Sequence, residues 1–425
     1  MSTHLRDDTL TFIFTEITAL THDLKTYDDS LDPYDHVDIP VIQGPVLLVG
    51  GFPRISIAEA VALLPPRQMV DRMIARFFEA KESAWAIFHI PTFMKQYEAF
   101  WDNPLDTTYT WIALLFVLYS HAALYFSLSS QELPGGMGSA EHALNESKYR
   151  AAQCLTLADY TMPGPYKVET IILYFGVEYL GRHQFILGTS TLLALTTRLA
   201  MHMGMHRDPK HYPNMTPFEG EMRRRLWTIL VEIDLLVSFQ FGVPSNIHKS
   251  NYDTEPPRNL LDEDFDQDTE ELPPSRPETE STVSLMPIVR NRLVEAFRAV
   301  VTATAAGNPT SYAEIMRIDK LVEDAHSKIP PNLRYRPFSQ SLFDPPLLLM
   351  QRQWLEMLCT SHVPRNPFDA WTVIILTIPA TSPGSLREDH TDSIARPEVS
   401  ECAPSEISLP CEKGRALRVF KAHLH

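Results

Sequence analysis

The sequence predicts an all-α fold, and three observations lead to this prediction. Apolar residues recur with helical period along most of the chain, most regularly at Leu192, Leu195, Leu199 and Met203. Helix start and stop signals flank these runs, and 34 prolines against 16 glycines indicate many breaks between helices. With 44% hydrophobic and 10% aromatic residues, the 425-residue chain can bury one large helical core or two modest ones.

Residues 1–55 are predicted to form a separate N-terminal segment. Apolar residues from Leu10 to Leu24 follow spacings of 3, 4, 3 and 4, which makes two heptads. Two heptads fit an ordinary amphipathic helix, or the remnant of a dimerisation helix. An acidic linker follows, and the apolar run from Val46 to Val49 predicts a short strand before Gly50, within a packed linker.

Capping signals and apolar stripes then predict a series of helices. Ser56 and Glu59 make a capping box that opens a short helix, and residues 69–78 make the next helix amphipathic. The run from Trp111 to Leu128 carries no charge, but it barely reaches the length of a membrane span and lacks flanking Lys or Arg. It therefore predicts a buried helix, and no membrane association is expected. Further helices are predicted over 141–157 and 168–180.

Two paired helices are predicted on either side of a short polar loop. The first ends at Gly204, where a left-handed C-terminal cap belongs. The second begins with Thr216 at the N-cap, Pro217 at the first helical position and Glu219 completing a capping box. Its helical period continues to the sequence Gly-Val-Pro244.

The charged residues of this helix pair need partners. Three consecutive arginines, 223–225, lie near a helix N-terminus and oppose the helix dipole. We therefore expect carboxylates such as Glu219 and Glu221, or backbone carbonyls, to hold them. Arg198 and Asp234 each lie on an otherwise apolar helix, so we expect an interhelical ion pair between them.

The chain becomes acidic and rich in proline after Pro244. From Asp262 to Glu280 nine carboxylates stand against one arginine, so residues 250–282 predict a solvated linker. Helical period returns over 284–305, 311–328 and 346–360. We therefore place one helical domain at 56–368, followed by an irregular, disordered tail at 369–425.

Several motifs in the middle of the chain resemble one family. They are Leu199-Ala-Met-His-Met-Gly-Met-His-Arg-Asp208, Glu221-Met-Arg-Arg-Arg-Leu-Trp227 and Pro256-Pro-Arg-Asn-Leu260, with Phe88-His-Ile-Pro-Thr-Phe93 upstream. The chain resembles the fungal-specific transcription factor domain, which is the middle homology region of fungal zinc-binuclear-cluster regulators. The resemblance implies an all-helical regulatory domain with a structural signature. The signature residues are Arg198, His206, Arg207, Asp208, Arg224, Arg225, Trp227, Asp234, Gly242 and Pro244.

The resemblance also implies regulation of DNA-templated transcription in the nucleus, with a share in the cytoplasm. Family members bind DNA as dimers through a separate cluster of six cysteines in a short basic stretch. Here no cysteine precedes Leu64, the four cysteines are scattered, and the net charge is −16. We therefore expect no cofactor in this chain, zinc only in an upstream cluster, and DNA contact only through such a cluster or a partner chain.

The expected partners are a second copy of the chain or a partner regulator, together with a small-molecule effector. An alternative is a stand-alone helical module that binds partners or effectors without DNA binding. A third class is an all-helical, magnesium-dependent enzyme similar to isoprenoid synthases, in which the acidic run 262–266 would hold the metal. That run lies in a proline-flanked segment, so the sequence favours a protein that is not an enzyme.

Metal and nucleophile patterns are weak. His202 and His206 have the spacing of two ligands on one helix face, but Gly204 and Pro209 end the helix around them. Cys154 and Cys359 lie on predicted helices, where a buried thiol is inert. We therefore predict neither a catalytic nor a metal site.

Overall fold

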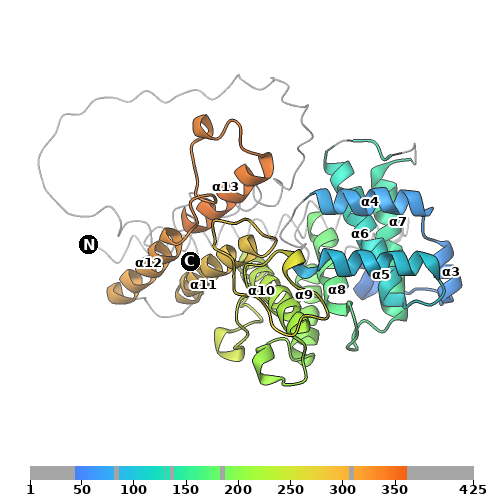
Figure 1. Ribbon diagram of the computed structural model, residues 1–425, viewed down its shortest axis with the longest axis horizontal. Coiled ribbons are helices and arrows are strands. Elements are labelled where there is room, and N and C mark those ends of the chain that lie inside the picture. Colours follow the sequence, from blue (N-terminus) through green and yellow to red (C-terminus); the bar gives the residue numbers. More distant parts are fainter. Residues whose placement is uncertain are drawn as a thin grey trace, which may run out of the picture. The chain divides into compact units, whose positions relative to one another are not determined.

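A computed structural model gives the fold, and the residues that it describes form α-helices and short 3-10 turns, with no strand among them (Figure 1). The all-α prediction is confirmed. The heptad run at 10–24 and the tail at 369–425 lie outside the described residues. The described residues are 44–80, 86–129, 131–134, 138–181, 187–305 and 311–360.

Within residues 44–108, where the structure describes all but 81–85, four helices precede the apolar helix that starts at Tyr109. The strand predicted before Gly50 is wrong, because the Leu48 and Gly50 amides donate to the carbonyls of Pro45 and Val46 and so close a helical turn. The capping box of Ser56 and Glu59 is confirmed, with both of its hydrogen bonds present. The four helices are α2 (Val46–Val49), α3 (Ile57–Ala62), α4 (Arg67–Glu79) and α5 (Ile90–Asp102).

Helix α6 (Tyr109–Leu128) lies at the centre of the larger hydrophobic core. It packs against α4, α7 (Ala140–Leu157) and α8 (Lys167–Leu180), as Figure 1 shows. Its length and composition would suit a membrane span, but all its residues from Thr110 to Phe126 are buried inside the protein. The prediction of a buried helix is therefore confirmed.

Two polar side chains of α6, those of Ser120 and His121, make hydrogen bonds within the core. Ser120 donates to the Phe116 carbonyl at 2.8 Å, and its hydroxyl also lies 2.8 Å from that of Ser147 on α7. His121 donates through Nε2 to the Leu173 carbonyl at 2.9 Å. Burial lowers the pKa of His121 to about 4, so the ring is neutral at physiological pH.

Helices α9 (Leu187–His202) and α10 (Pro217–Gln240) form the predicted pair. Gly204 has φ +77°, and the following amide, that of Met205, donates to the Ala200 carbonyl at 3.0 Å. This is the left-handed helix end that the sequence predicted. The capping box of Thr216 and Glu219 is also present at the start of α10.

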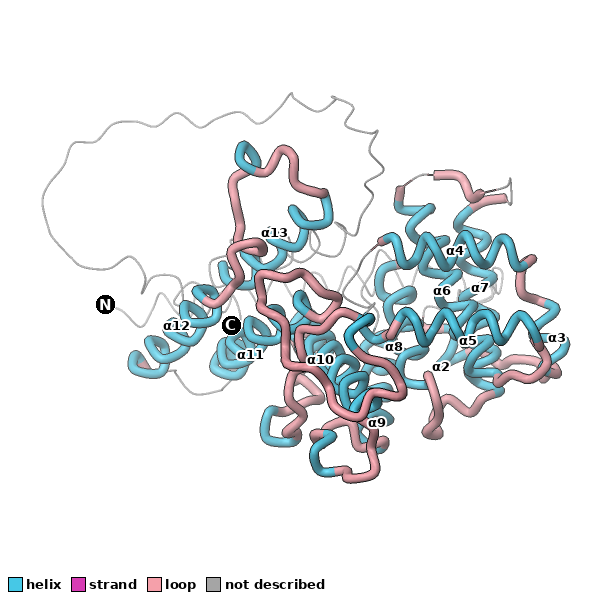
Figure 2. Tube along the Cα trace, in the orientation of Figure 1, coloured by secondary structure: helices cyan, strands magenta, loops and turns pink. Residues whose placement is uncertain are grey.

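The chain after α10 runs as loop to residue 284, with only brief 3-10 turns, which Figure 2 shows in pink and cyan. The three helices predicted in the remainder are confirmed, and α11 packs against α10, α12 and α13. The turns are η3 (Lys249–Asn251) and η4 (Asp262–Asp264), and the helices are α11 (Leu285–Ala305), α12 (Tyr312–Ser327) and α13 (Pro346–Thr360).

Two hydrophobic cores share helix α10. Leu226 and Leu230 belong to the larger core around α6. Leu235 and Leu236, near the other end of the same helix, pack into a second core with residues of α11 and α13. Helix α10 therefore connects the two cores.

Candidate functional site

Asp208 is the centre of the turn between α9 and α10. Its side chain is fully buried, and the Arg224 guanidinium donates to both of its oxygens, at 3.1 and 2.8 Å. The amides of Lys210 and Glu255 donate to the same carboxylate at 3.1 and 3.0 Å. Burial alone would raise the pKa of Asp208, but these hydrogen bonds lower it to about 2. The turn therefore contains a permanent buried anion.

The other two arginines of the run also point inward. Arg223 donates to the Met203 carbonyl at 3.1 Å. Arg225 is fully buried; its Nη1 lies 2.7 Å from Asp262, and its Nε lies 4.0 Å from Glu221. The prediction that carbonyls and carboxylates hold these arginines is confirmed for both.

Asp262 connects the acidic segment to the body of the domain. Besides its contact with Arg225, it accepts a hydrogen bond from the Ile90 amide at 2.9 Å. His89 donates through Nε2 to the carbonyls of Asp262 and Phe265, at 2.7 and 3.0 Å. The Arg225 guanidinium also lies 5.0 Å from the centre of the Phe265 ring. The start of α5 and the middle of α10 therefore hold the same short turn.

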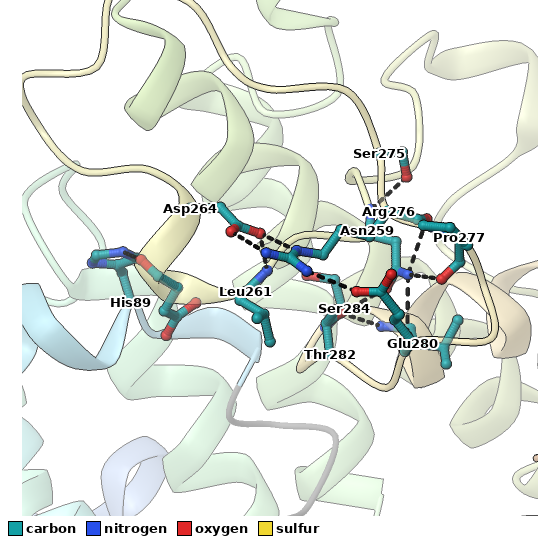
Figure 3. A network of polar contacts seen from close by, with 12 residues as sticks. His89, Asn259, Leu261, Asp264, Ser275, Arg276, Pro277, Glu280, Thr282 and Ser284 are labelled. Carbon is teal, nitrogen blue, oxygen red and sulfur yellow. Dashed lines mark hydrogen bonds and ion pairs between the residues drawn. The ribbon is translucent and has the colours of Figure 1, made fainter.

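Asn259 organises the rest of the acidic segment, as Figure 3 shows. Its side-chain nitrogen donates to the carbonyls of Arg276, Pro277 and Glu280, and its side-chain oxygen accepts from Thr282 at 2.6 Å. Arg276 donates to both oxygens of Asp264 at 2.6 Å.

The prediction of a solvated linker at 250–282 is therefore wrong for the residues anchored to the domain, whereas Glu263 and residues 266–268 and 270–271 are exposed as predicted. Asn259, Leu260 and Phe265 are buried, and arginines neutralise Asp262 and Asp264. The physical reason is that the charge count along the chain did not include Arg225, which reaches the segment from α10.

Asp234 and Arg198 do not form the predicted ion pair. The buried Asp234 carboxylate accepts from the Ser245 hydroxyl at 2.5 Å, the Asn246 amide group at 2.8 Å and the Ile247 backbone at 2.9 Å. Arg198 is exposed. The loop that follows α10 satisfies Asp234, so the carboxylate fastens that loop to the helix and needs no cation from α9.

The remaining signature residues lie around the same turns. His206 is half-buried with its ring 6.4 Å from the Trp227 ring, and Trp227 is itself buried. Arg207 is exposed. Gly242 has φ +65° just after α10, where a left-handed cap is needed, and Pro244 follows on the surface. The signature thus lies on α9 and α10, in the turn that joins them and in the loop that follows α10.

No metal or nucleophile site is found in the part of the chain that the structure describes. No three His, Cys, Asp or Glu side chains converge there as a metal site would require. His202 is exposed, whereas His206 faces Trp227. Burial raises the pKa of Cys154 and Cys359 to about 12, so both thiols stay protonated.

The turn between α9 and α10, residues 203–216, contains His206, Arg207 and Asp208 and is called the signature turn here. A cavity of about 720 Å³ lies between this turn, α5 and the starts of α8 and α10. Glu169 of α8 and Arg223 of α10 face it. No motif predicted this cavity, although four methionines within twenty positions, Met203, Met205, Met215 and Met222, would have been a signal, since methionine lines adaptable binding surfaces. Its volume lies in the range of small-molecule sites.

Comparisons with known proteins agree with these motifs. The family model described as "Fungal specific transcription factor domain" matches residues 74–301. The "Zn(2)-C6 fungal-type transcription factor mpsB" of Macrophomina phaseolina is 37% identical over 315 residues, which cover 74% of this chain and 42% of that protein. The "Zn(2)-C6 fungal-type transcription factor pigI" of Monascus ruber is 35% identical over 314 residues, covering 74% of this chain and 38% of that protein.

A third relative is the "Equisetin cluster transcription factor eqxF" of Fusarium heterosporum. It is 36% identical over 330 residues, which cover 75% of this chain and 47% of that protein. The chain therefore spans less than half the length of these three relatives. No solved structure matches it.

Proposed function

The chain belongs to the fungal-specific transcription factor domain family, and we propose that it regulates transcription as a helical regulatory domain. We propose that it acts in the nucleus and that part of the protein is also present in the cytoplasm. The observation that carries the proposal is the family match over 74–301, which spans the signature turn and both sides of α10. The printed names of the relatives, which are transcription factors, support the same role.

DNA is read, in this proposal, by a zinc cluster in another segment or in a partner chain. A basic run can bind phosphate only if its cations are free, but Arg223, Arg224 and Arg225 are each directed at a carbonyl or a carboxylate of the domain. The net charge of −16 would also repel a nucleic acid. In this proposal the partner is a second copy of the chain or another regulator, and the two proteins bind DNA as a complex.

The acidic run 262–266, which would hold magnesium if the protein were an isoprenoid-synthase-like enzyme, supports a regulator instead of an enzyme. A diphosphate-binding site needs carboxylates that are free to share metal ions. Asp262 is instead paired with Arg225 in the interior, and Asp264 is paired with Arg276. Loss of either carboxylate is therefore expected to reduce the stability of the fold and not to abolish an enzymatic activity.

A tethering experiment tests the proposal. The full chain is fused to a heterologous DNA-binding domain in a fungal host, and transcription from a reporter carrying its sites is measured. We expect reporter output to change with the fusion, and the untethered chain to leave a labelled promoter fragment unshifted in a mobility assay. An Asp208→Ala fusion, which disrupts the signature turn, is expected to lose the effect, and Arg207→Ala is its surface control.

Two results would contradict the proposal. A well-expressed fusion that leaves the reporter at the level of the DNA-binding domain alone would favour the stand-alone interaction module. Magnesium-dependent release of diphosphate from an isoprenoid diphosphate would favour the enzyme if Asp262→Ala abolishes it and Glu141→Ala, an exposed position outside the acidic run, keeps it.

A further inference from the structure

The cavity beside the signature turn is lined by many polarizable side chains. Four methionines, Met203, Met205, Met215 and Met222, face it together with aromatic rings from several elements. Thioethers and aromatic rings are polarizable, and aromatic faces attract cations by their quadrupole. The aromatic residues of the lining are Phe88, Phe93, Tyr166, Tyr212 and Phe218.

Most polar groups that face the cavity already have partners. Glu219 accepts from the Thr216 amide in the capping box. Arg223 donates to the Met203 carbonyl and lies 5.8 Å from the centre of the Tyr212 ring. His89 is bonded to the turn at 262–265 through one ring nitrogen and to Thr92 through the other. These groups hold the walls in place.

Glu169 is different, because no side chain of the described residues pairs with it. It lies in the first turn of α8, half-buried, and only its own backbone amide supports its charge. Burial raises the pKa of Glu169 to about 7. A carboxyl group that faces a largely apolar cavity without a partner is available to a ligand.

Tyr166 is one of the residues that line the cavity. It also lines a second cavity of about 720 Å³ and hydrogen-bonds to Gln96, which faces both cavities as well. Its backbone has φ +55°, a left-handed conformation that is strained for a bulky residue. The strained residue therefore stands between two cavities, three positions before Glu169.

We propose that the cavity at the signature turn binds a small hydrophobic amine, with the protonated nitrogen paired to Glu169 and the apolar body among the methionines and aromatic rings. Two carboxylates face the cavity against one guanidinium, so the lining favours a cation over an anion. The volume accommodates a ligand of a few fused rings. Binding of such an amine is a property of the domain that is separate from transcription, so it can be measured without a promoter.

A matched ligand series tests the proposal on the full chain. Naphthylbutylamine, naphthylbutanol and naphthylbutanoate share one apolar body and differ in charge, and the naphthyl emission reports binding. We expect the amine to bind, the alcohol to bind roughly ten- to hundredfold more weakly, and the acid to show no saturable binding, because a charge-assisted hydrogen bond is stronger than a neutral one. Equal affinities for amine and alcohol, or no binding of the amine, would overturn the proposal.

Variants separate the ligand role of Glu169 from a helix-capping role. Glu169→Gln should lower the affinity for the amine to that of the alcohol and leave the alcohol unchanged. Glu141→Gln removes an exposed first-turn glutamate from α7 and should change neither affinity. Met222→Trp fills the cavity and should abolish binding of both ligands. If Glu169→Gln keeps full affinity for the amine, Glu169 is not the partner and the proposal fails.

The pH dependence of binding gives a second readout. Amine binding needs the ionised form of Glu169, so affinity should rise from about pH 6 to pH 8 in the natural chain and stay level in Glu169→Gln. His89, Glu219, Arg223, Tyr166 and Tyr212 also face the cavity, and they are unchanged in that comparison. A pH dependence that persists in Glu169→Gln would assign it to one of these groups and contradict the assignment to Glu169.

Discussion

Arg224 on α10 holds the carboxylate of Asp208 with two nitrogen atoms, at 3.1 and 2.8 Å, across the turn that ends α9. Asp208 is fully buried, whereas the Arg224 side chain is 15% exposed. The pair therefore fixes how the two helices follow one another, and the amides of Lys210 and Glu255 extend the same contact into the neighbouring loops.

Replacing Asp208 by Ala is expected to destabilise the domain by about 3–5 kcal/mol, because it leaves the Arg224 cation without a partner in a low-dielectric site. Urea unfolding at neutral pH, followed by circular dichroism, measures the change. Arg207→Ala removes the exposed neighbouring charge and should stay within about 0.5 kcal/mol of the natural chain. Equal stability of the two variants would show that the Asp208 contact contributes nothing.

Asp234→Ala is expected to cost about 2–4 kcal/mol, because the amide of Ile247 and two side chains lose their buried acceptor. Arg198→Ala should be nearly neutral, since Arg198 is exposed. A double-mutant cycle measures the coupling between the two positions, which we expect to be near zero. A coupling of about 1 kcal/mol or more would restore the interhelical ion pair that the sequence predicted.

Asp262→Ala should release the acidic segment from the domain, because Arg225 and the Ile90 amide both lose their acceptor. Limited proteolysis measures the effect, and we expect cleavage within 255–282 at protease levels that leave the natural chain intact. Glu263→Ala changes an exposed neighbour and should keep the protected pattern. Protection that survives in Asp262→Ala would mean that the Asn259 network alone holds the segment.

Glu169→Gln is expected to stabilise the protein at alkaline pH and not at acid pH. The folded-state pKa of Glu169 is about 7, above its ordinary value of 4.5. Between these values the folded state keeps a proton that the unfolded state has lost, so the natural chain loses stability as pH rises through this window. The Gln variant lacks this loss.

The gain from Glu169→Gln should therefore grow by about 3 kcal/mol between pH 4.5 and pH 8. Urea unfolding of both proteins across this range, without ligand, measures the difference, and Glu141→Gln is the matched first-turn control. A difference that stays constant with pH would place the pKa of Glu169 at its ordinary value.

Local chemistry made most of the fold predictable. The capping boxes at Ser56 and Thr216 and the left-handed end at Gly204 each depend on residues within a few positions, and all three occur as predicted. The burial of α6 also followed from its own composition. Such signals need no knowledge of the rest of the chain.

The site was less predictable, because its partners are distant in the sequence. Asp262 meets Arg225 across 37 positions and His89 across 173. Asp234 offers the opposite case, since its partners at 245–247 are near in sequence but lie in a loop whose path no periodicity defines. The cavity is assembled from four separate segments, so only the folded chain brings Glu169 to the methionines.

The ordered acidic segment has a consequence for how the domain unfolds. It is bonded to α5 and α10 through Asp262, and Asn259 ties it through Thr282 to the start of α11. The hydrophobic core around α6 and the one around α11 are thus joined by the acidic segment as well as by α10. We therefore expect the two cores to unfold as one cooperative unit, because the acidic segment and α10 each contact both of them.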